Sequence, residues 1–266
     1  MIRKHLFRRK AESDSVRWRL HEPARIEAFS DALMAFAVTL IVVSLEVPRT
    51  FDLLLDSMKG FAGFAICFTL LILIWHDQYL FFRRYGLQDT RTIFYNTVLL
   101  FVVLFFVYPL KFLFSYLTLG NKSVTENGEV LKRFSSDEQI CQLMIIYGAG
   151  YIIIYAMIAL MHVHALKLKR ELLLSPLEIY NTKTYLRGYS GMIGVGLFSL
   201  SLAVSGLCIN SSNLAAFSGI SYGLIGPVLS IIHAVRNKKI TQLFTQKEIE
   251  TVTNEVVIIE EEETAG

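Results

Sequence analysis

The sequence lacks the motifs of several large protein classes, and long stretches of it contain no charged residue. It has no TVGYG-like filter sequence, no Walker phosphate-binding motif and no HExxH zinc motif. These absences argue against a potassium channel with a re-entrant filter loop, an ATP-driven pump and an intramembrane metalloprotease of that type. No segment has the length and composition of a soluble catalytic domain, so we do not expect an enzyme.

Cysteine is scarce as well. The three cysteines, Cys67, Cys141 and Cys208, show no CxxC spacing, so the sequence predicts neither a disulfide framework nor a cysteine metal site. His162 and His164 are two residues apart, and side chains at that spacing point about 200° away from each other on a helix. They cannot easily share one ion, and we expect no metal and no other bound cofactor.

The charged residues are grouped, with long gaps between the groups. No Lys, Arg, Asp or Glu occurs between Asp31 and Glu46, Lys59 and Asp77, Arg91 and Lys111, Glu138 and Lys167, or Arg187 and Arg236. A helix that spans a membrane needs about 20 mostly apolar residues, and the polar turn at 210–213 divides the last gap in two. The sequence therefore predicts an all-α membrane protein with six transmembrane helices, at about 28–47, 58–81, 93–117, 139–165, 186–208 and 214–235.

Basic residues lie mainly on one side of these six spans. If the N-terminus is cytoplasmic, 20 of the 26 Lys and Arg residues fall in cytoplasmic segments. This excess favours cytoplasmic N- and C-termini, and it makes the net charge of +3 a sign of membrane topology, not of nucleic-acid binding. We divide the chain into a basic cytoplasmic lead (1–24), a transmembrane domain (25–239) and an acidic cytoplasmic tail (240–266). The lead also has the composition to touch anionic headgroups.

The segment from Arg25 to Asp31 places charged and polar groups at the mouth of the first span. Such groups cost roughly 2.5–3.5 kcal/mol each near a helix centre, so they usually face protein or water and serve a function. On this helix the residues that follow Phe36 on its face are apolar except for one threonine: Thr39, Leu40, Val43 and Val47. Arg25, Phe29 and Ala32 extend the same stripe towards the cytoplasm. Asp31 lies about 140° around the helix from Phe36. We therefore expect Asp31 to point into the subunit's own bundle, while the face of Phe36 could line an ion path.

The residues alone leave other interpretations open. An apolar stripe at helical spacing is more often packing than pore, and a lone threonine such as Thr39 commonly bonds the carbonyl four residues earlier. Ser30 and Asp31 could simply cap a helix start. A proton- or cation-coupled transporter that uses Asp31 and His76 is a second hypothesis, and a membrane scaffold that transports nothing is a third.

The second and third spans carry side chains that could hold the first helix. Trp75 and His76 end the second span near the cytoplasmic boundary, at the level of Asp31. We expect one of them to bond Asp31 or Ser30, although a tryptophan there is also common at a membrane surface. Asn96, early in the third span, can bridge helices through hydrogen bonds.

The region around the first span resembles the signature of the endo-lysosomal transmembrane potassium channels and their prokaryotic homologues: Arg25-x-x-x-Phe29-Ser30-Asp31, then Ala-Leu-Met-Ala-Phe36-Ala-Val-Thr39-Leu40. Further features that resemble this family are Trp75-His76, the stretch from Asp89 to Asn96, and Pro109. The resemblance covers roughly residues 25–110. Prokaryotic members of the family carry a single six-span unit in each chain, which agrees with the six spans predicted from hydropathy.

The resemblance implies a homotetramer in which the first helix of each subunit lines a central pore. The permeating ion would be K⁺, with no cofactor. The partners would be other copies of the chain, the lipid bilayer and monovalent cations, with no nucleic acid. As a prokaryotic homologue, the chain would lie in the plasma membrane of a bacterium and pass through it several times.

The resemblance also assigns roles along the first helix. Phe36 takes the position of the hydrophobic constriction, where Ile or Leu is usual, and Thr39 takes the position of a hydroxyl ring that contributes to selectivity for potassium over sodium. Leu40 and Val43 would continue the wall. The signature residues hold the helix against its neighbours: Arg25, Phe29, Ser30 and Asp31. Four Phe36 rings would form a hydrophobic neck of the kind that gates by dewetting.

Overall fold

The computed structural model describes residues 19, 23–43, 50–51, 54–55, 58, 61–119, 124–126, 129–131, 134, 136–209 and 211–243. Most of the predicted basic lead and most of the predicted acidic tail lie outside these residues, so the boundaries of these two segments stay predictions. Residues 44–47 of the predicted first span also lie outside them.

The described chain consists mainly of long helices. In chain order they are α2 (Arg25–Val43), α4 (Phe61–Tyr85), α5 (Thr90–Leu119), α6 (Asp137–Lys167), α7 (Pro176–Ile209), α8 (Ser212–Ser221), the 3-10 helix η1 (Tyr222–Leu224) and α9 (Ile225–Leu243). A short antiparallel hairpin of β1 (Val124–Glu126) and β2 (Glu129–Leu131) lies between α5 and α6, with Thr125 opposite Val130.

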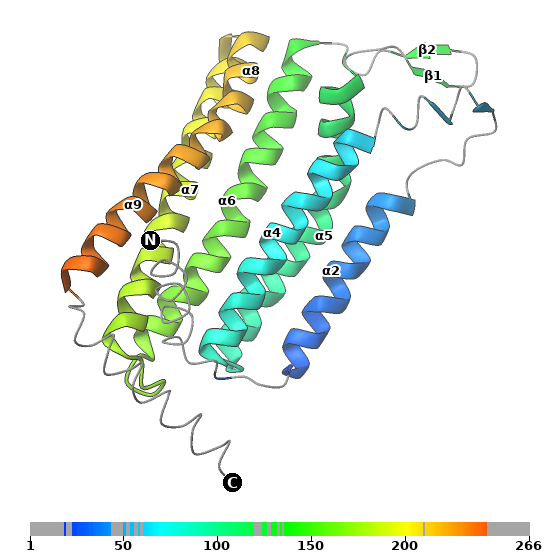
Figure 1. Cartoon of the computed structure of the whole chain (residues 1–266). Coiled ribbons are helices and arrows are strands. Elements are labelled where there is room, and N and C mark those ends of the chain that lie inside the picture. The colour runs from blue at the N-terminus through cyan, green and yellow to red at the C-terminus, as the bar shows by residue number, and fades with distance from the viewer. Residues whose placement is uncertain are drawn as a thin grey trace, which may run out of the picture.

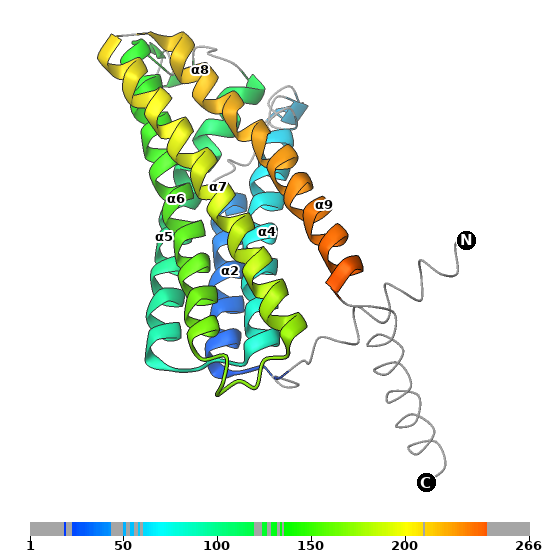
Figure 2. The ribbon, with the colours of Figure 1, turned by 90° about the vertical axis from the view of Figure 1, so that its left-hand side faces the viewer.

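The helices run alternately up and down the molecule (Figure 1). α2, α5 and α7 begin at the end of the bundle where α4, α6 and α9 finish. We call this end the basic end, because the connections there carry a concentration of cations: Arg83, Arg84, Arg91, Lys167 and Arg170. Figure 2 shows α8 and α9 following one another along one line, with α9 diverging from the other helices towards its C-terminal end.

Among the described residues, five helical segments are long and apolar enough to cross a membrane: Gly63–Tyr85, Thr90–Val107, Glu138–Lys167, Pro176–Ile209 and Asn213–Arg236. They correspond to the second to sixth predicted spans, in agreement with the predicted all-α membrane protein. The first predicted span corresponds to α2, which is not among the five. Its 19 residues include Arg25, Glu27 and Asp31, and only the part of the predicted span up to Val43 is described.

α7 begins at Pro176, well before the predicted start near 186. The cause is a capping box, in which Ser175 N–H donates to Glu178 Oε2 at 2.8 Å and Glu178 N–H donates to Ser175 Oγ at 3.2 Å. Pro176 takes the first helical position, where a missing N–H costs nothing. The helix therefore starts in a polar segment that hydropathy alone does not assign to it.

Apolar packing places α2 at the edge of the bundle. Met34 and Ala37 of α2 join a buried cluster with Cys67 of α4, Leu99 of α5 and Ile158 of α6. Among the larger contacts between elements, α2 packs against α4 and α5, and Figure 1 shows no further helix on its outer side. One side of α2 is therefore packed against other helices, and none of the described helices covers the other side.

A second cluster closes the basic end. It contains the buried aromatic residues Phe81, Phe82 and Tyr85 of α4, together with Met161 of α6 and Leu174 before α7. Burying each of these large side chains stabilises the fold by roughly 1.5–3 kcal/mol. The cluster fixes the ends of α4 and α6 relative to the start of α7.

Candidate functional site

The two sides of α2 differ in burial. Its buried residues recur every three or four positions, as expected for one face of a helix: Glu27, Ser30, Met34 and Ala37. On the other face, Phe29 is 60% exposed, Phe36 is 53% exposed and Leu40 is 40% exposed. Arg25, Ala32 and Thr39 are exposed as well. Val43 is the last residue of α2, and its side chain lies outside the described part.

Hydrogen bonds hold the buried face through Ser30. Its hydroxyl donates to the Ile26 carbonyl at 2.7 Å and accepts a bond from Asn96 Nδ2 at 2.8 Å. Asn96 Oδ1 in turn accepts a bond from Gln78 Nε2. Ser30, Asn96 and Gln78 are all almost fully buried, so this chain of bonds ties α2 to α5 and then to α4. Asn96 therefore bridges helices, as the sequence predicts.

Asp31 has a separate partner on α4. Trp75 Nε1 donates to Asp31 Oδ1 at 2.7 Å, which is one of the contacts predicted from the sequence. The Trp75 ring also stacks on Tyr79, with ring centroids 5.5 Å apart. Asp31 remains exposed while its carboxylate turns towards its own bundle, whereas His76 is exposed and bonds neither Asp31 nor Ser30 in the described structure.

Thr39 bonds within its own helix. Its hydroxyl donates to the Ala35 carbonyl at 2.9 Å, the local bond that is common for a threonine in a helix. The hydroxyl oxygen keeps lone pairs that can still accept a bond or contact a cation. Thr39 therefore presents an oxygen on the exposed face, one turn of helix away from Phe36.

The comparisons with known proteins agree on one family. A profile described as endosomal/lysosomal potassium channel TMEM175 matches residues 25–106. A relative from Marivirga tractuosa, named "Potassium channel", is 39% identical over 227 residues, which cover 84% of this chain and 91% of the relative. This chain belongs to the TMEM175 family. Membership of a family of channels confirms the prediction that the chain is not an enzyme.

Other members of the TMEM175 family are more distant or are known from crystals. A potassium channel of Chamaesiphon minutus is 32% identical over 104 residues, which cover 36% of this chain and 51% of the relative. The crystal structure of a threonine-to-alanine variant of the potassium channel MtTMEM175, bound to a nanobody–MBP fusion, superposes with a TM-score of 0.71 at 37% identity. That match covers 83% of this chain and 96% of the crystallised chain. A TMEM175 homologue from Chamaesiphon minutus has the same fold, with a TM-score of 0.52 at 20% identity over 78% of this chain and 96% of the other.

Sequence reasoning missed one further residue of the signature segment in this TMEM175 chain. Glu27 is 3% exposed and lies 3.5 Å from Arg83, measured from Oε1 to Nε. Arg83 also lies over the Tyr79 ring, with Cζ 5.3 Å from the centroid. The sequence does show a carboxylate two positions after Arg25, within the polar signature segment, and this position could have marked Glu27 as a further buried ionic contact.

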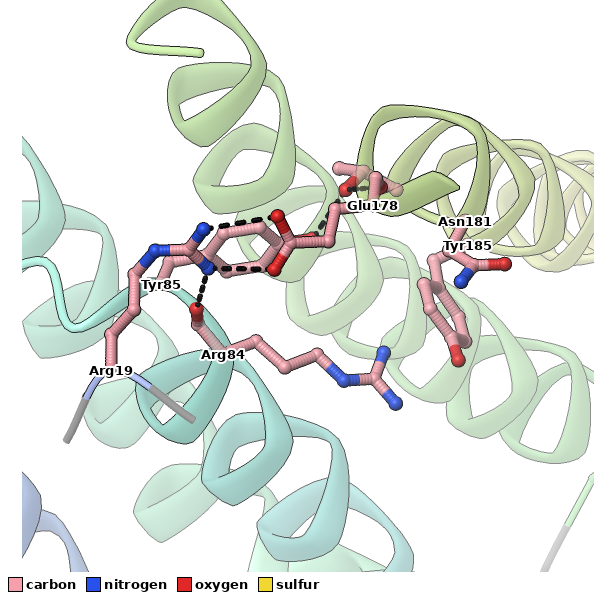
Figure 3. A pocket seen from close by; sticks show the side chains of 7 residues that line it. Arg19, Arg84, Tyr85, Glu178, Asn181 and Tyr185 are labelled. Carbon is pink, nitrogen blue, oxygen red and sulfur yellow. Dashed lines mark hydrogen bonds and ion pairs between the residues drawn. The ribbon is translucent and has the colours of Figure 1, made fainter. Parts of the chain in front are cut away.

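A second missed contact joins the lead to α7. The two terminal guanidinium nitrogens of Arg19 each donate to one carboxylate oxygen of Glu178 at 3.0 Å. One of them also donates to the Arg84 carbonyl at 2.7 Å (Figure 3). The Ser175–Glu178 capping pattern is visible in the sequence and places the carboxylate at a helix start. Nothing in the sequence identifies Arg19, among the many basic residues of the lead, as its partner.

A third polar contact fixes the start of α5 near the basic end. Asp89 accepts bonds from the Thr92 hydroxyl at 2.6 Å and from the Arg91 N–H at 3.2 Å, and it lies 2.8 Å from His164 Nε2. Burial raises the pKa of the Asp89 carboxyl, but the bonds from Thr92 and His164 outweigh burial, so its pKa lies below the ordinary value.

His162 and His164, which the sequence predicts cannot easily share one metal ion, contact different partners. His162 Nδ1 lies 2.9 Å from the Ile158 carbonyl oxygen, to which it donates when it carries the proton, and its ring lies 5.2 Å from that of Phe81. His164 instead contacts Asp89. In the part of the chain that the structure describes, no group of three or more His, Cys, Asp or Glu could hold a metal ion.

Proposed function

We propose that this chain is a potassium channel of six transmembrane spans, in which four copies surround a pore lined by the exposed face of α2. Family membership and the relatives named as potassium channels support passive conduction of K⁺. The six spans are α2 and the five apolar helical segments. A pore lined by one helix from each chain needs rotational symmetry to close, and a cyclic homo-oligomer provides it.

The observation that carries this proposal is the division of α2 into two faces. Its polar contacts with Trp75 and Asn96 lie on the side that faces α4 and α5, and they hold the helix in one orientation. The opposite side presents Phe36 and Thr39, which none of the described elements covers. A helix that is fixed on one side and uncovered on the other is suited to line a shared axis.

The exposed residues have the chemistry that such a pore needs. A ring of Phe36 side chains would make a hydrophobic neck that excludes water when it is narrow. A ring of Thr39 hydroxyls one turn further would replace part of the hydration shell of K⁺. Leu40 and Val43 would continue the wall. Because no charged residue lies on this stretch, selectivity should be weaker than in a filter of backbone carbonyls.

The basic end faces the cytoplasm in this proposal. The excess of Lys and Arg there supports the orientation through the positive-inside rule. Both chain termini are then cytoplasmic, and the membrane is the plasma membrane of a bacterium. The signature residues Arg25, Phe29, Ser30 and Asp31 then lie at the cytoplasmic mouth of the pore.

A coupled transporter is the weaker alternative. It would need Asp31 and His76 to exchange protons or to bind a cation together, but Asp31 bonds Trp75 and His76 bonds neither Asp31 nor Ser30 in the described structure. The relatives are named as channels. A scaffold that transports nothing would be an exception among relatives that are named as channels.

Reversal potentials of reconstituted protein between potassium and sodium solutions test the proposal. We expect a preference for K⁺ in the wild type, a lower preference in Thr39→Ala and a larger conductance in Phe36→Ala. Thr69→Ala is the matched control, because Thr69 is also exposed and bonds a carbonyl four residues earlier, but on α4. Equal permeability ratios in wild type and Thr39→Ala would remove the threonine ring from the proposal, and the absence of any current would remove the channel.

A further inference from the structure

A small cavity opens at the basic end, between the end of α4 and the first turns of α7 (Figure 3). Its lining includes two arginines, Arg19 and Arg84, and the α7 residues Glu178, Asn181 and Tyr185. The conduction proposal, which uses the exposed face of α2, does not use this cavity. Its lining contains two positively charged side chains and one negatively charged side chain.

Arg19 and Glu178 neutralise each other through their paired 3.0 Å bonds. Arg84 forms no such pair, since none of the described carboxylates lies within ion-pair distance of it. Its guanidinium group lies over the ring of Tyr185, with Cζ 4.5 Å from the ring centroid. Figure 3 shows this side chain extending away from the Arg19–Glu178 pair, towards Tyr185 and Asn181. Among the residues that line the cavity, Arg84 is therefore a positive charge without an ion-pair partner within the described structure.

Asn181 adds a hydrogen-bond donor to the same cavity. Its side-chain oxygen accepts bonds from Arg236 of α9, from Nε at 3.1 Å and from a terminal guanidinium nitrogen at 3.0 Å. These bonds leave its amide nitrogen to face the cavity (Figure 3), where no described acceptor lies within bonding distance. Asn181 as a whole is 9% exposed, and its amide N–H remains available to an oxygen of a ligand.

Asn181 and the Tyr185 ring that carries Arg84 lie on one turn of α7. Asn181 and Tyr185 are four residues apart, so they share a face of the helix. Arg84 is thereby held at one end of this turn and Arg236 at the other. A guanidinium group and an amide N–H together match the oxygens of a phosphate group.

We propose that this cavity binds the phosphate group of an anionic ligand, through the Arg84 guanidinium and the Asn181 amide. The basic end carries the charge pattern of a cytoplasmic membrane surface, where anionic phospholipids are available. Ile231 and Val235 on α9 are 64% and 50% exposed and would lie beside the acyl chains of a bound lipid. A soluble phosphate offers the same oxygens without the chains.

Binding to the purified full-length chain tests the proposal without any measurement of current, so it can fail independently of the channel. The chain is placed in nanodiscs of phosphatidylcholine alone, or of phosphatidylcholine and phosphatidylglycerol in equal parts. Co-purified phosphatidylglycerol is quantified by mass spectrometry, and binding of inorganic phosphate is measured by calorimetry in the phosphatidylcholine discs.

Arg84→Gln removes the charge but keeps the backbone carbonyl that Arg19 uses, so the neighbouring ion pair is retained. Asn181→Asp keeps an oxygen for Arg236 and replaces the donor with a negative charge. We expect each variant to lower binding about tenfold or more, the change that follows loss of a charge-assisted hydrogen bond. Arg187→Gln, on the exposed side of α7, is the matched control and should change binding less than twofold.

Enrichment of phosphatidylglycerol without binding of inorganic phosphate would support the proposal and assign a lipid as the ligand. Binding of inorganic phosphate that is lost in both variants would also support it, with a soluble phosphate as the ligand. Undiminished binding in Arg84→Gln and Asn181→Asp would overturn the proposal. An equal loss in Arg187→Gln would overturn it too, because binding would then follow overall surface charge.

Discussion

The ion pair between Arg19 and Glu178 makes a strong prediction about how the lead is held to the helices. The Glu178 side chain is 7% exposed and that of Arg19 is 18% exposed. Losing one partner of a buried ion pair costs about 3–5 kcal/mol, whereas an exposed pair is worth about 0–1 kcal/mol. This pair is mostly but not fully buried, so we expect Arg19→Met to lower the free energy of unfolding by about 2–3 kcal/mol.

The two partners should not be equivalent. Arg19→Met leaves a carboxylate in the more buried position, whereas Glu178→Gln leaves the more exposed guanidinium, which water can reach. Glutamine also keeps an oxygen for the N–H of Ser175. We therefore expect a smaller loss in Glu178→Gln, about 1 kcal/mol, and we expect the double variant to be more stable than Arg19→Met alone.

Thermal unfolding of the purified chain in detergent, followed by size-exclusion chromatography, measures these differences. For a protein of this size 1 kcal/mol shifts the midpoint by about 2–4 °C, so Arg19→Met should lower it by about 4–12 °C. Arg187→Met, at an exposed arginine of α7, is the control. A midpoint for Arg19→Met no lower than that of the control, or a double variant less stable than Arg19→Met, would refute the assignment of a stabilising buried pair.

Two other contacts give measurable expectations. Asn96→Leu leaves the buried Gln78 donor without its acceptor, so we expect a loss of about 1–3 kcal/mol in unfolding free energy; an unchanged midpoint would contradict the bridge between α4 and α5. Asp89 has a lowered pKa in the folded chain, so its contacts stabilise the fold above the ordinary carboxyl pKa, and this contribution is lost as the pH falls through the folded-state value. The midpoint of the wild type should therefore fall more steeply below about pH 4 than that of Asp89→Asn; parallel pH profiles would show that these contacts contribute nothing.

Much of the helical framework could be predicted from charge spacing, because an uncharged stretch long enough to cross a bilayer can satisfy its backbone only as a helix. Helix ends were less predictable. α7 begins at Pro176 since a capping box starts it in a polar segment, and the last predicted span is divided by η1. Hydropathy reports which residues suit lipid, and it does not report how far a helix continues beyond them.

The contacts of the signature segment were only partly predictable. Trp75 was one of two candidates for the partner of Asp31, because both lie at the same depth in neighbouring spans. Gln78 and Glu27 were not identified, although both are buried and bonded or paired. Their partners come from other helices, and a single sequence does not show how those helices are rotated about their own axes.

The most direct test of whether the exposed face of α2 lines the pore is modification by a charged thiol reagent during current recording. Thr39→Cys and, as control, Thr69→Cys are made in a background without Cys67, Cys141 and Cys208. If the face of α2 lines the conduction path, the reagent blocks current through Thr39→Cys and leaves current through Thr69→Cys unchanged. Full modification of Thr39→Cys, verified by mass spectrometry, with no change in current would contradict a pore on this face of α2.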